Sequence, residues 1–265
     1  KLQLYRLLLT TSCLPCLAWN PWLTTLKRSF ASQVSFPFTY RDSSFRSSKR
    51  FSQTRSYSTM SDFNLSKASA PRGAFILFEG VDRCGKTTQS QLLAKYLNEQ
   101  LGEGNCHHMR FPDRTTTIGT IINSYLTSKT ELNDYSIHLL FSANRWERKQ
   151  FIESALSQGQ AVVCDRYAYS GVAFTSAKGL DLTWCQTCDQ GLPSPDAIIY
   201  LDILPEEAAQ RGQFGEERYE RLDFQQKVRE QFMKLKANDE DNQQVPWYVI
   251  NAKQPIEVIH EEIKQ

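Results

Sequence analysis

The 265-residue sequence lacks a long uninterrupted hydrophobic run. Its apolar stretch at residues 7–26 contains Pro15, Asn20 and Pro21. A membrane-spanning helix would lose backbone hydrogen bonds there, and lipid offers nothing to replace them, so we expect no membrane anchor. The chain is 40% hydrophobic and 23% charged, with a mean hydropathy of -0.48, which argues against a collagen-like, wholly disordered or polytopic membrane protein.

Acidic residues are nearly absent from residues 1–61, which hold nine Lys or Arg and a single acid, Asp42. A basic, Ser-rich segment of this kind is typical of a mitochondrial presequence, and we expect it to be disordered. A secretory signal with its apolar region at residues 7–17 is the alternative. The chain begins with Lys1, which indicates a fragment or gene-model product, and translation from Met60 would give a cytosolic form.

The rest of the chain holds 22 Lys or Arg and 28 acids, a net charge of −6. A negatively charged body is a poor partner for nucleic acid or an anionic membrane, so we expect neither as a partner. Any anionic ligand must then be held by cations that cluster locally.

Cysteines number seven and include two C-x-x-C pairs, Cys13/Cys16 and Cys185/Cys188. Two such pairs could form a four-thiolate zinc site. One pair lies in the basic extension, far from the other, so we favour scattered free thiols of an intracellular protein.

After Pro71, short β-rich runs alternate with helical stretches, a pattern that predicts a parallel sheet covered by helices. The five expected strands are residues 74–79, 106–111, 161–165, 197–202 and 247–252. Helices are expected at residues 88–101 and 118–126, at 134–159 with Asp134 as the cap, after Pro205, and around residues 224–235. The sequence therefore predicts one α/β domain of about 195 residues, with a five-stranded parallel sheet and helices on both faces.

Residues 80–87, GVDRCGKT, match the phosphate-loop pattern G-x-x-x-x-G-K-[ST] between the first expected strand and the first expected helix. In such a loop the backbone amides curl around a phosphate and the helix N-terminus adds its dipole. We expect Lys86 to reach the β and γ phosphates of a nucleotide, and Thr87 to ligate Mg²⁺.

Two charged residues inside this loop need a separate explanation. A carboxylate at Asp82 is repelled by a triphosphate unless another group compensates it. We expect Asp82 to accept a hydrogen bond from a sugar hydroxyl of a second substrate, and Arg83 to bridge the transferring phosphate oxygens. The alternative is a solvated ion pair between these two side chains.

Three further clusters predict the phosphate acceptor's site. Arg114 follows the second strand and suits an acceptor phosphate. Phe141 and Arg145, at i and i+4 of one helix, suit stacking of a flat base and donation to its carbonyl edge, although spacing alone favours a core Phe beside a surface Arg.

The third cluster, Asp165 and Arg166, ends the third strand, where the carboxylate would lie near Mg²⁺ or its waters and the arginine on the acceptor phosphate. A strand-end ion pair without a ligand is the alternative. Residues 211–220 carry glycines and charges that suit a mobile lid over the nucleotides, or else a solvated loop.

Taken together, these segments resemble thymidylate kinases of the eukaryotic type over residues 72–263. The resemblance rests on FEGVDRCGKT (78–87), RFPDR (110–114), HLLFSANRW (138–146), DRY (165–167), SGVAF (170–174) and RYE (218–220). It implies a P-loop, nucleoside monophosphate kinase fold for residues 70–265. The implied reaction is transfer of the ATP γ-phosphate to dTMP with Mg²⁺, giving dTDP for dTTP synthesis. The family also implies a homodimer. From the body of the chain we expect the cytoplasm, the nucleus or both, and mitochondria if residues 1–61 are a working presequence.

The resemblance also implies site residues. The implied ATP-binding residues are Gly80, Val81, Asp82, Arg83, Cys84, Gly85, Lys86, Thr87, Thr88, Arg211 and Arg218. The implied dTMP-binding residues are Asp82, Phe111, Arg114, Phe141, Arg145, Arg166, Phe174, Tyr219 and Gln225. The implied catalytic residues are Lys86, Arg83, Asp165 and Arg166, and the implied metal ligands are Thr87 and Asp165.

Several roles follow from the family alone. Asp82 is expected to meet the sugar 3′-hydroxyl, and Phe174 to crowd the 2′ position. Arg211 and Arg218 are expected near the adenine and the phosphates, respectively.

Rival readings remain. Another monophosphate kinase, preferring deoxyguanylate or uridylate, is the nearest. A GTPase is disfavoured because no Asn-Lys-x-Asp motif occurs. A non-catalytic nucleotide-binding protein would be expected to lack Lys86, Thr87 or Asp165, and all three are present.

Overall fold

The structure is a computed structural model that describes residues 71–212 and 214–265. The basic extension, the Cys13/Cys16 pair and Met60 lie outside the described residues, so their interpretation stays a prediction. Among the residues that the structure describes, every helix is too short or too polar to span a lipid bilayer.

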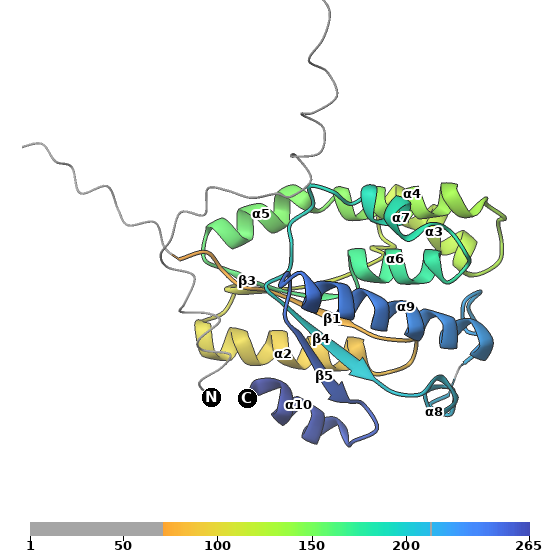
Figure 1. The fold of residues 1–265 in the computed structure, drawn as a ribbon. Coiled ribbons are helices and arrows are strands. Elements are labelled where there is room, and N and C mark those ends of the chain that lie inside the picture. Colours follow the sequence, from red (N-terminus) through yellow and green to blue (C-terminus); the bar gives the residue numbers. More distant parts are fainter. Residues whose placement is uncertain (1–70, 213) are drawn as a thin grey trace, which may run out of the picture. The chain divides into compact units, whose positions relative to one another are not determined.

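Five parallel strands form one sheet in the order β2-β3-β1-β4-β5 (Figure 1). They are β1 (Phe75–Glu79), β2 (Cys106–Arg110), β3 (Ala161–Asp165), β4 (Ala197–Asp202) and β5 (Trp247–Asn251). Each expected strand is present, and no end differs by more than one residue. The predicted parallel α/β sheet is therefore confirmed.

Helices connect the strands and cover both faces of the sheet. They are α2 (Lys86–Leu101), α3 (Thr117–Leu126), α4 (Asp134–Trp146), α5 (Lys149–Ser157), α6 (Ala168–Ser176), α7 (Leu182–Thr187), α8 (Pro205–Ala209), α9 (Leu222–Asp241) and α10 (Ile256–Lys264). Figure 1 shows α2 and α10 on one side of the strands and α5, α6 and α9 on the other. The helix predicted at 118–126 has buried Ile122, Tyr125 and Leu126, whereas Ile121 is exposed.

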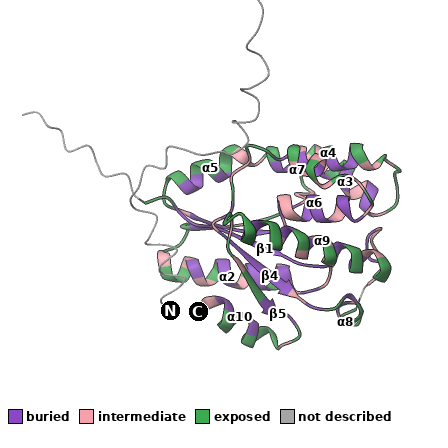
Figure 2. Cartoon of the chain, in the orientation of Figure 1, coloured by how far each residue is buried: buried purple, intermediate pink, exposed green. Residues whose placement is uncertain are grey.

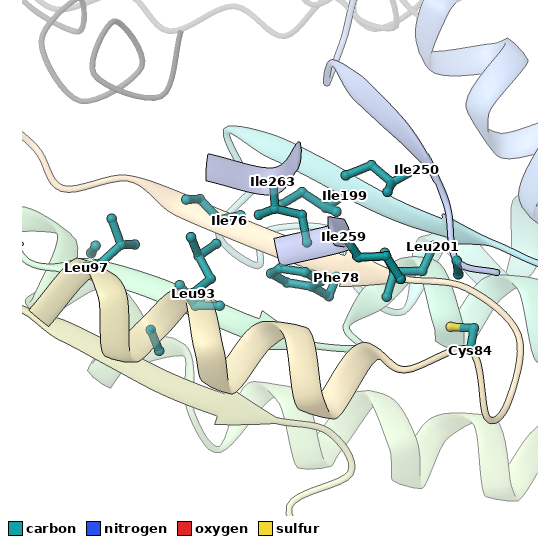
Figure 3. Packing of buried hydrophobic residues seen from close by; sticks show 14 of the residues in the cluster. Ile76, Phe78, Cys84, Leu93, Leu97, Ile199, Leu201, Ile250, Ile259 and Ile263 are labelled. Atoms are coloured by element: carbon teal, nitrogen blue, oxygen red, sulfur yellow. The ribbon is translucent and has the colours of Figure 1, made fainter. Parts of the chain in front are cut away.

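Alternation along the central strand explains the two layers. Ile76 and Phe78 of β1 pack with Leu93 of α2 and Ile259 of α10, as Figure 3 shows. The intervening Phe75 and Leu77 pack on the opposite face, in a cluster that includes residues of α5. A strand covered on both faces is buried along its whole length (Figure 2).

The prediction of a single helix at residues 134–159 is wrong. The structure has two helices there, α4 and α5, which are separated at residues 147 and 148. Tertiary contacts account for the break, because Thr116 donates to Glu147 at 2.8 Å and Arg148 pairs with Asp113. The expected cap is also off by one residue, since the Asn133 side chain accepts from the backbone of residue 135.

The carboxyl ends of three strands meet at one edge of the sheet. In the register, Phe78 of β1 and Arg110 of β2 both stand opposite Asp165 of β3. The chain segments that follow these ends therefore converge, which is the usual ligand-binding edge of an open α/β sheet.

Candidate active site

The phosphate loop leaves β1 at Gly80 and enters α2 at Lys86. A Cβ at Gly80 would lie 2.7 Å from the Leu201 carbonyl oxygen and 2.9 Å from the Cys84 sulfur, so only glycine fits beside β4. Gly85 has φ 103° and is the N-cap of α2. The two glycines therefore let the loop turn tightly between β1 and α2, which suits phosphate binding at a helix N-terminus.

Lys86 is buried and folds back over the loop. Its Nζ donates to the Val81 carbonyl oxygen at 2.6 Å and to the Cys84 sulfur at 3.4 Å. The side chain nevertheless lines the cleft described below. A buried ammonium tied to neutral acceptors is suited to an incoming anion.

Thr87 and Asp165 form the candidate metal site. The Thr87 hydroxyl donates to Asp165 Oδ2 at 2.5 Å, and Arg110 Nε lies 3.5 Å from the same oxygen. Asp165 Oδ1 is buried without a hydrogen-bond partner among the described residues. The described part of the chain holds no cluster of three or more His, Cys, Asp or Glu suited to a metal. One hydroxyl and one unsatisfied carboxylate oxygen still fit Mg²⁺, which takes its other ligands from phosphates and water.

Asp82 is bound by Arg166, which lies between β3 and α6, and by Gln225 of α9. Arg166 Nη2 pairs with its Oδ1, and Gln225 Nε2 donates to its Oδ2 at 2.6 Å. Gln225 Oε1 also accepts from the Asp82 backbone at 2.8 Å. The Asp82 carboxylate therefore has the compensating cation that its place beside a phosphate site requires.

Arg166 adopts φ 68°, and its side chain reaches the phosphate loop. Nη1 donates to the Gly80 carbonyl oxygen at 3.3 Å and to Ser170 Oγ at 3.1 Å. Its guanidinium lies 5.1 Å from the centre of the Phe174 ring. These contacts hold one arginine between the phosphate loop and α6.

Sequence reasoning assigned no role to Glu79, the fully buried last residue of β1. Its carboxylate accepts from the backbone N–H groups of Tyr167 and Ser170 at 3.1 and 2.9 Å, and from Ser170 Oγ at 2.5 Å. Burial raises the pKa of Glu79, and these hydrogen bonds and the charge of Arg166 oppose that rise. An acid inside a buried strand was the available signal.

A second residue without an assigned role, Glu220, joins residues 211–220, the segment predicted as a lid and called the lid loop below, to the phosphate loop. Oε1 accepts from Arg83 Nε at 2.7 Å. Oε2 accepts from the consecutive backbone N–H groups of residues 215, 216 and 217 at 3.0, 3.0 and 3.2 Å. The hydrogen bond from Arg83 to Glu220 raises the pKa of the arginine. The Glu220 carboxylate therefore shapes the lid loop and also holds Arg83.

Two arginines contact this region from other directions. Arg114 donates to Asn123 at 2.9 Å and to Glu217 of the lid loop at 2.7 Å. Arg211 donates to the Cys84 carbonyl oxygen at 3.0 Å and to that of Ala252. Side-chain oxygens therefore hold Arg114, and main-chain oxygens hold Arg211 beside the phosphate loop.

The far end of the site is aromatic. Phe174 lies 5.6 Å from Tyr219, measured between ring centres, and Phe141 is half-buried in the same cluster. Arg145, one turn after Phe141 on α4, is 2% exposed and forms an ion pair with Asp189 at 2.6 Å. A surface arginine beside a core Phe, the alternative raised above, is therefore wrong for Arg145.

These groups surround one cleft of about 630 Å³. Predicted site residues that line it are Asp82, Arg83, Gly85, Lys86, Thr87, Thr88, Phe111, Arg114, Phe141, Arg145, Asp165, Arg166, Phe174, Arg211 and Tyr219. Gly80, Val81, Cys84, Arg218 and Gln225 are not among the lining residues. Gln225 reaches the cleft through Asp82, whereas Arg218 pairs with Glu131 and donates to the Tyr125 carbonyl oxygen.

The similarity of this chain to known proteins identifies its family. The sequence profile of the thymidylate kinase family matches residues 78–263. A thymidylate kinase of Arabidopsis thaliana is 48% identical over 74% of this chain and 71% of its own length, and that of Homo sapiens is 46% identical over 74% and 90%. The solved thymidylate kinase of Candida albicans aligns with a TM-score of 0.65 at 36% identity, covering 73% of this chain and 90% of that protein. This chain belongs to the thymidylate kinase family.

Proposed function

We propose that the protein transfers the γ-phosphoryl group of ATP to the phosphate of dTMP, giving ADP and dTDP for dTTP synthesis. The observation that carries the proposal is that Lys86, Arg114 and Arg166 line the same cleft. A kinase must hold two anionic nucleotides with their phosphates facing each other, and such a site requires cations on both sides.

On the donor side, the phosphate loop binds the ATP phosphates through its amides and Lys86. Arg83 reaches the γ-phosphate, and Arg211 and Arg218 belong to the lid near the adenine and the phosphates. The support for Arg211 is its contact with the Cys84 carbonyl oxygen, which puts it beside the loop. The Arg218 guanidinium pairs with Glu131 at 2.7 Å.

On the acceptor side, Arg114 and Arg166 hold the dTMP phosphate, and Asp82 meets the sugar 3′-hydroxyl. The aromatic end of the cleft takes the thymine, with Phe141 stacking on the ring and Arg145 donating to its carbonyl. Phe174 crowds the 2′ position and so favours deoxyribose. Phe111, Tyr219 and Gln225 complete this side.

Mg²⁺ belongs to the proposal because the residues present fit it. Thr87 Oγ1 and Asp165, whose buried Oδ1 has no hydrogen-bond partner in the part of the chain that the structure describes, would hold the ion directly or through water. When bound, the ion would supply positive charge that neutralises the charge developing on the phosphates.

Phosphoryl transfer needs little covalent help from a protein, so we assign no general base. Lys86, Arg83 and Arg166 position the phosphates and neutralise charge on the transferring group. The lid loop excludes water, which keeps ATP from being hydrolysed instead.

We also propose a homodimer. Its support is a row of exposed apolar residues on α4, in which Tyr135 is 52%, Leu139 50% and Trp146 38% exposed. Light scattering on the full chain at increasing concentration tests it, and a constant monomer mass contradicts it.

The compartment is proposed as cytoplasm or nucleus, or mitochondria if residues 1–61 act as a presequence. Diffuse signal from a reporter fused to that extension would exclude the mitochondrial option.

The decisive test of the activity uses the full chain with Mg²⁺-ATP and a panel of monophosphates, namely dTMP, dUMP, dCMP, dGMP and UMP. ADP formation should be fastest with dTMP at low concentration. Equal rates with all acceptors, or a preference for deoxyguanylate or uridylate, would refute the substrate assignment.

A further inference from the structure

The guanidinium of Arg145 is clamped by one carboxylate in the protein interior. Its Nε donates to Asp189 Oδ1 at 3.1 Å and its Nη2 to Oδ2 at 2.6 Å. The two side chains are 3% and 6% exposed. Two parallel bonds fix the plane of a guanidinium, and separating such a pair in the interior leaves both charges unpaired. Arg145 is therefore restricted to one orientation.

Asp189 is itself attached to the helix that carries Arg145. Ser142 Oγ, on α4, lies 2.8 Å from Asp189 Oδ1. Trp146 Nε1, also on α4, donates to the Cys188 carbonyl oxygen at 3.0 Å. The segment after α7 and the helix α4 thus hold each other, so the carboxylate has a fixed position from which to orient the arginine.

Gly171 of α6 bounds the same guanidinium. A Cβ at this position would lie 2.7 Å from Arg145 Nη2 and 2.9 Å from Nη1. Gly171 is helical, so space rather than backbone conformation is what requires glycine here. Arg145 is held between Asp189 and the backbone of α6, and both Arg145 and Gly171 line the cleft.

This restriction has a chemical consequence for base recognition. A guanidinium only donates, and with Nε and one Nη2 hydrogen bound to Asp189, its remaining N–H groups are those available to the cleft. Thymine presents an oxygen acceptor at position 4, whereas cytosine presents an amino donor there. A fixed donor facing another donor leaves both unpaired, and a mobile arginine would swing aside and tolerate either base.

We propose that Asp189 is a specificity-determining positioning residue. By fixing Arg145, it makes the cleft accept a 4-oxo pyrimidine monophosphate and reject the 4-amino analogue. The inference rests on the proposed function. Asp189 is not among the residues that line the cleft, so it acts through Arg145.

The test compares three variants of the full chain by their kcat/KM for dTMP and dCMP at saturating ATP, together with the KM for ATP. Asp189→Asn keeps the shape of the side chain but replaces one carboxylate oxygen, an acceptor, with an amide NH2 group, a donor. Gly171→Ala pushes on the guanidinium and leaves Asp189 in place. The control is Asp202→Asn, because Asp202 forms a similar pair with Arg229 at 2.8 and 2.9 Å outside the cleft lining.

Asp189→Asn and Gly171→Ala should each lower the ratio of kcat/KM for dTMP over dCMP by about tenfold or more. The KM for ATP should stay within about twofold of the wild type, and Asp202→Asn should leave the ratio unchanged. A purely structural role would lower the rates with both acceptors together and leave the ratio intact.

The proposal is overturned if the ratio is unchanged in Asp189→Asn. If that variant does not fold, an unchanged ratio in Gly171→Ala overturns it equally. Failure of the proposed function is a separate outcome, and it is measured on the wild-type enzyme alone. If the wild type shows no preference for dTMP, the proposed function is wrong, and there is no base discrimination that Asp189 could support.

Discussion

Ser170 Oγ donates a hydrogen bond of 2.5 Å to the buried carboxylate of Glu79, joining α6 to the end of β1. The same carboxylate accepts from the backbone N–H groups of Tyr167, the N-cap residue of that helix, and of Ser170 in its first turn. The N-cap residue of α6, Tyr167, makes no capping hydrogen bond with its side chain. Glu79, at the end of β1, caps the helix instead. Because Ser170 also accepts from Arg166, the position of this arginine depends on Glu79.

Replacing Glu79 should therefore cost more stability than its single side chain suggests. Glu79→Ala leaves three buried donors unpaired, and we expect the free energy of unfolding to fall by about 3 kcal/mol or more. Glu79→Gln keeps an acceptor and should cost about 1–2 kcal/mol. Urea unfolding measures both. The exposed Glu230→Ala is the control, with an expected change within about 0.5 kcal/mol; an equal, small effect at Glu79 would contradict this role.

Stability should fall as the solution becomes acidic because of buried His138. Its ring lies 2.8 Å from Thr175 Oγ1 and 3.0 Å from the Cys185 carbonyl oxygen, and burial lowers its pKa. Below its ordinary value near 6.5, the unfolded chain takes up a proton that the folded ring does not. The free energy of unfolding then decreases by up to about 1.4 kcal/mol per pH unit until the lowered pKa is reached.

Urea unfolding of wild type and His138→Gln between pH 7.5 and 5.5 isolates this contribution. His108 and His260, whose pKa values burial also lowers, contribute equally to both curves. The variant should show a shallower loss of stability below pH 6.5. Parallel curves would mean that His138 is protonated in the folded state.

Lys86→Met tests the donor side of the cleft. Methionine fills a similar volume in the buried site but cannot donate to a phosphate. We expect kcat to fall by about 10²–10³, the cost of removing one charge-stabilising donor, with little change in thermal midpoint. Retention of wild-type turnover in a folded variant would exclude Lys86 from catalysis.

Glu220 should affect turnover through Arg83. Glu220→Ala removes the acceptor of the Arg83 Nε hydrogen bond and of the three loop amides, and we expect kcat to fall by about tenfold or more. In an Arg83→Ala background the same change should have little further effect on kcat, because residues that act as a unit are not additive. Additive losses from the two substitutions would show that they act separately.

Local patterns were sufficient for the strands and the phosphate loop. Both features are encoded by contiguous residues. The strands are runs of apolar β-forming residues between turns, and the phosphate loop has glycines at a set spacing before Lys86. The division of α4 from α5 has no such signal. Helix-forming residues continue through Glu147 and Arg148, and the break depends on their contacts with residues 113–116.

The positioning residues share one reason for being missed. Glu79, Asp189 and Glu220 each bind a partner remote in the chain, at separations of 91, 44 and 137 residues. Each is an acid whose spacing to its partner carries no period of a helix or strand. The side chains expected to touch substrate were found from motifs, but the carboxylates that orient them appear only when the strands and helices are assembled.

The most direct test of phosphoryl transfer between two nucleotides in this cleft is to follow the γ-phosphate itself. The full chain is incubated with Mg²⁺, dTMP and ATP labelled with ³²P at the γ position, and the products are separated. The account predicts that the label moves from ATP to the β-phosphate of dTDP, with ADP formed in equal amount. Label released as inorganic phosphate while dTMP remains unchanged would contradict it.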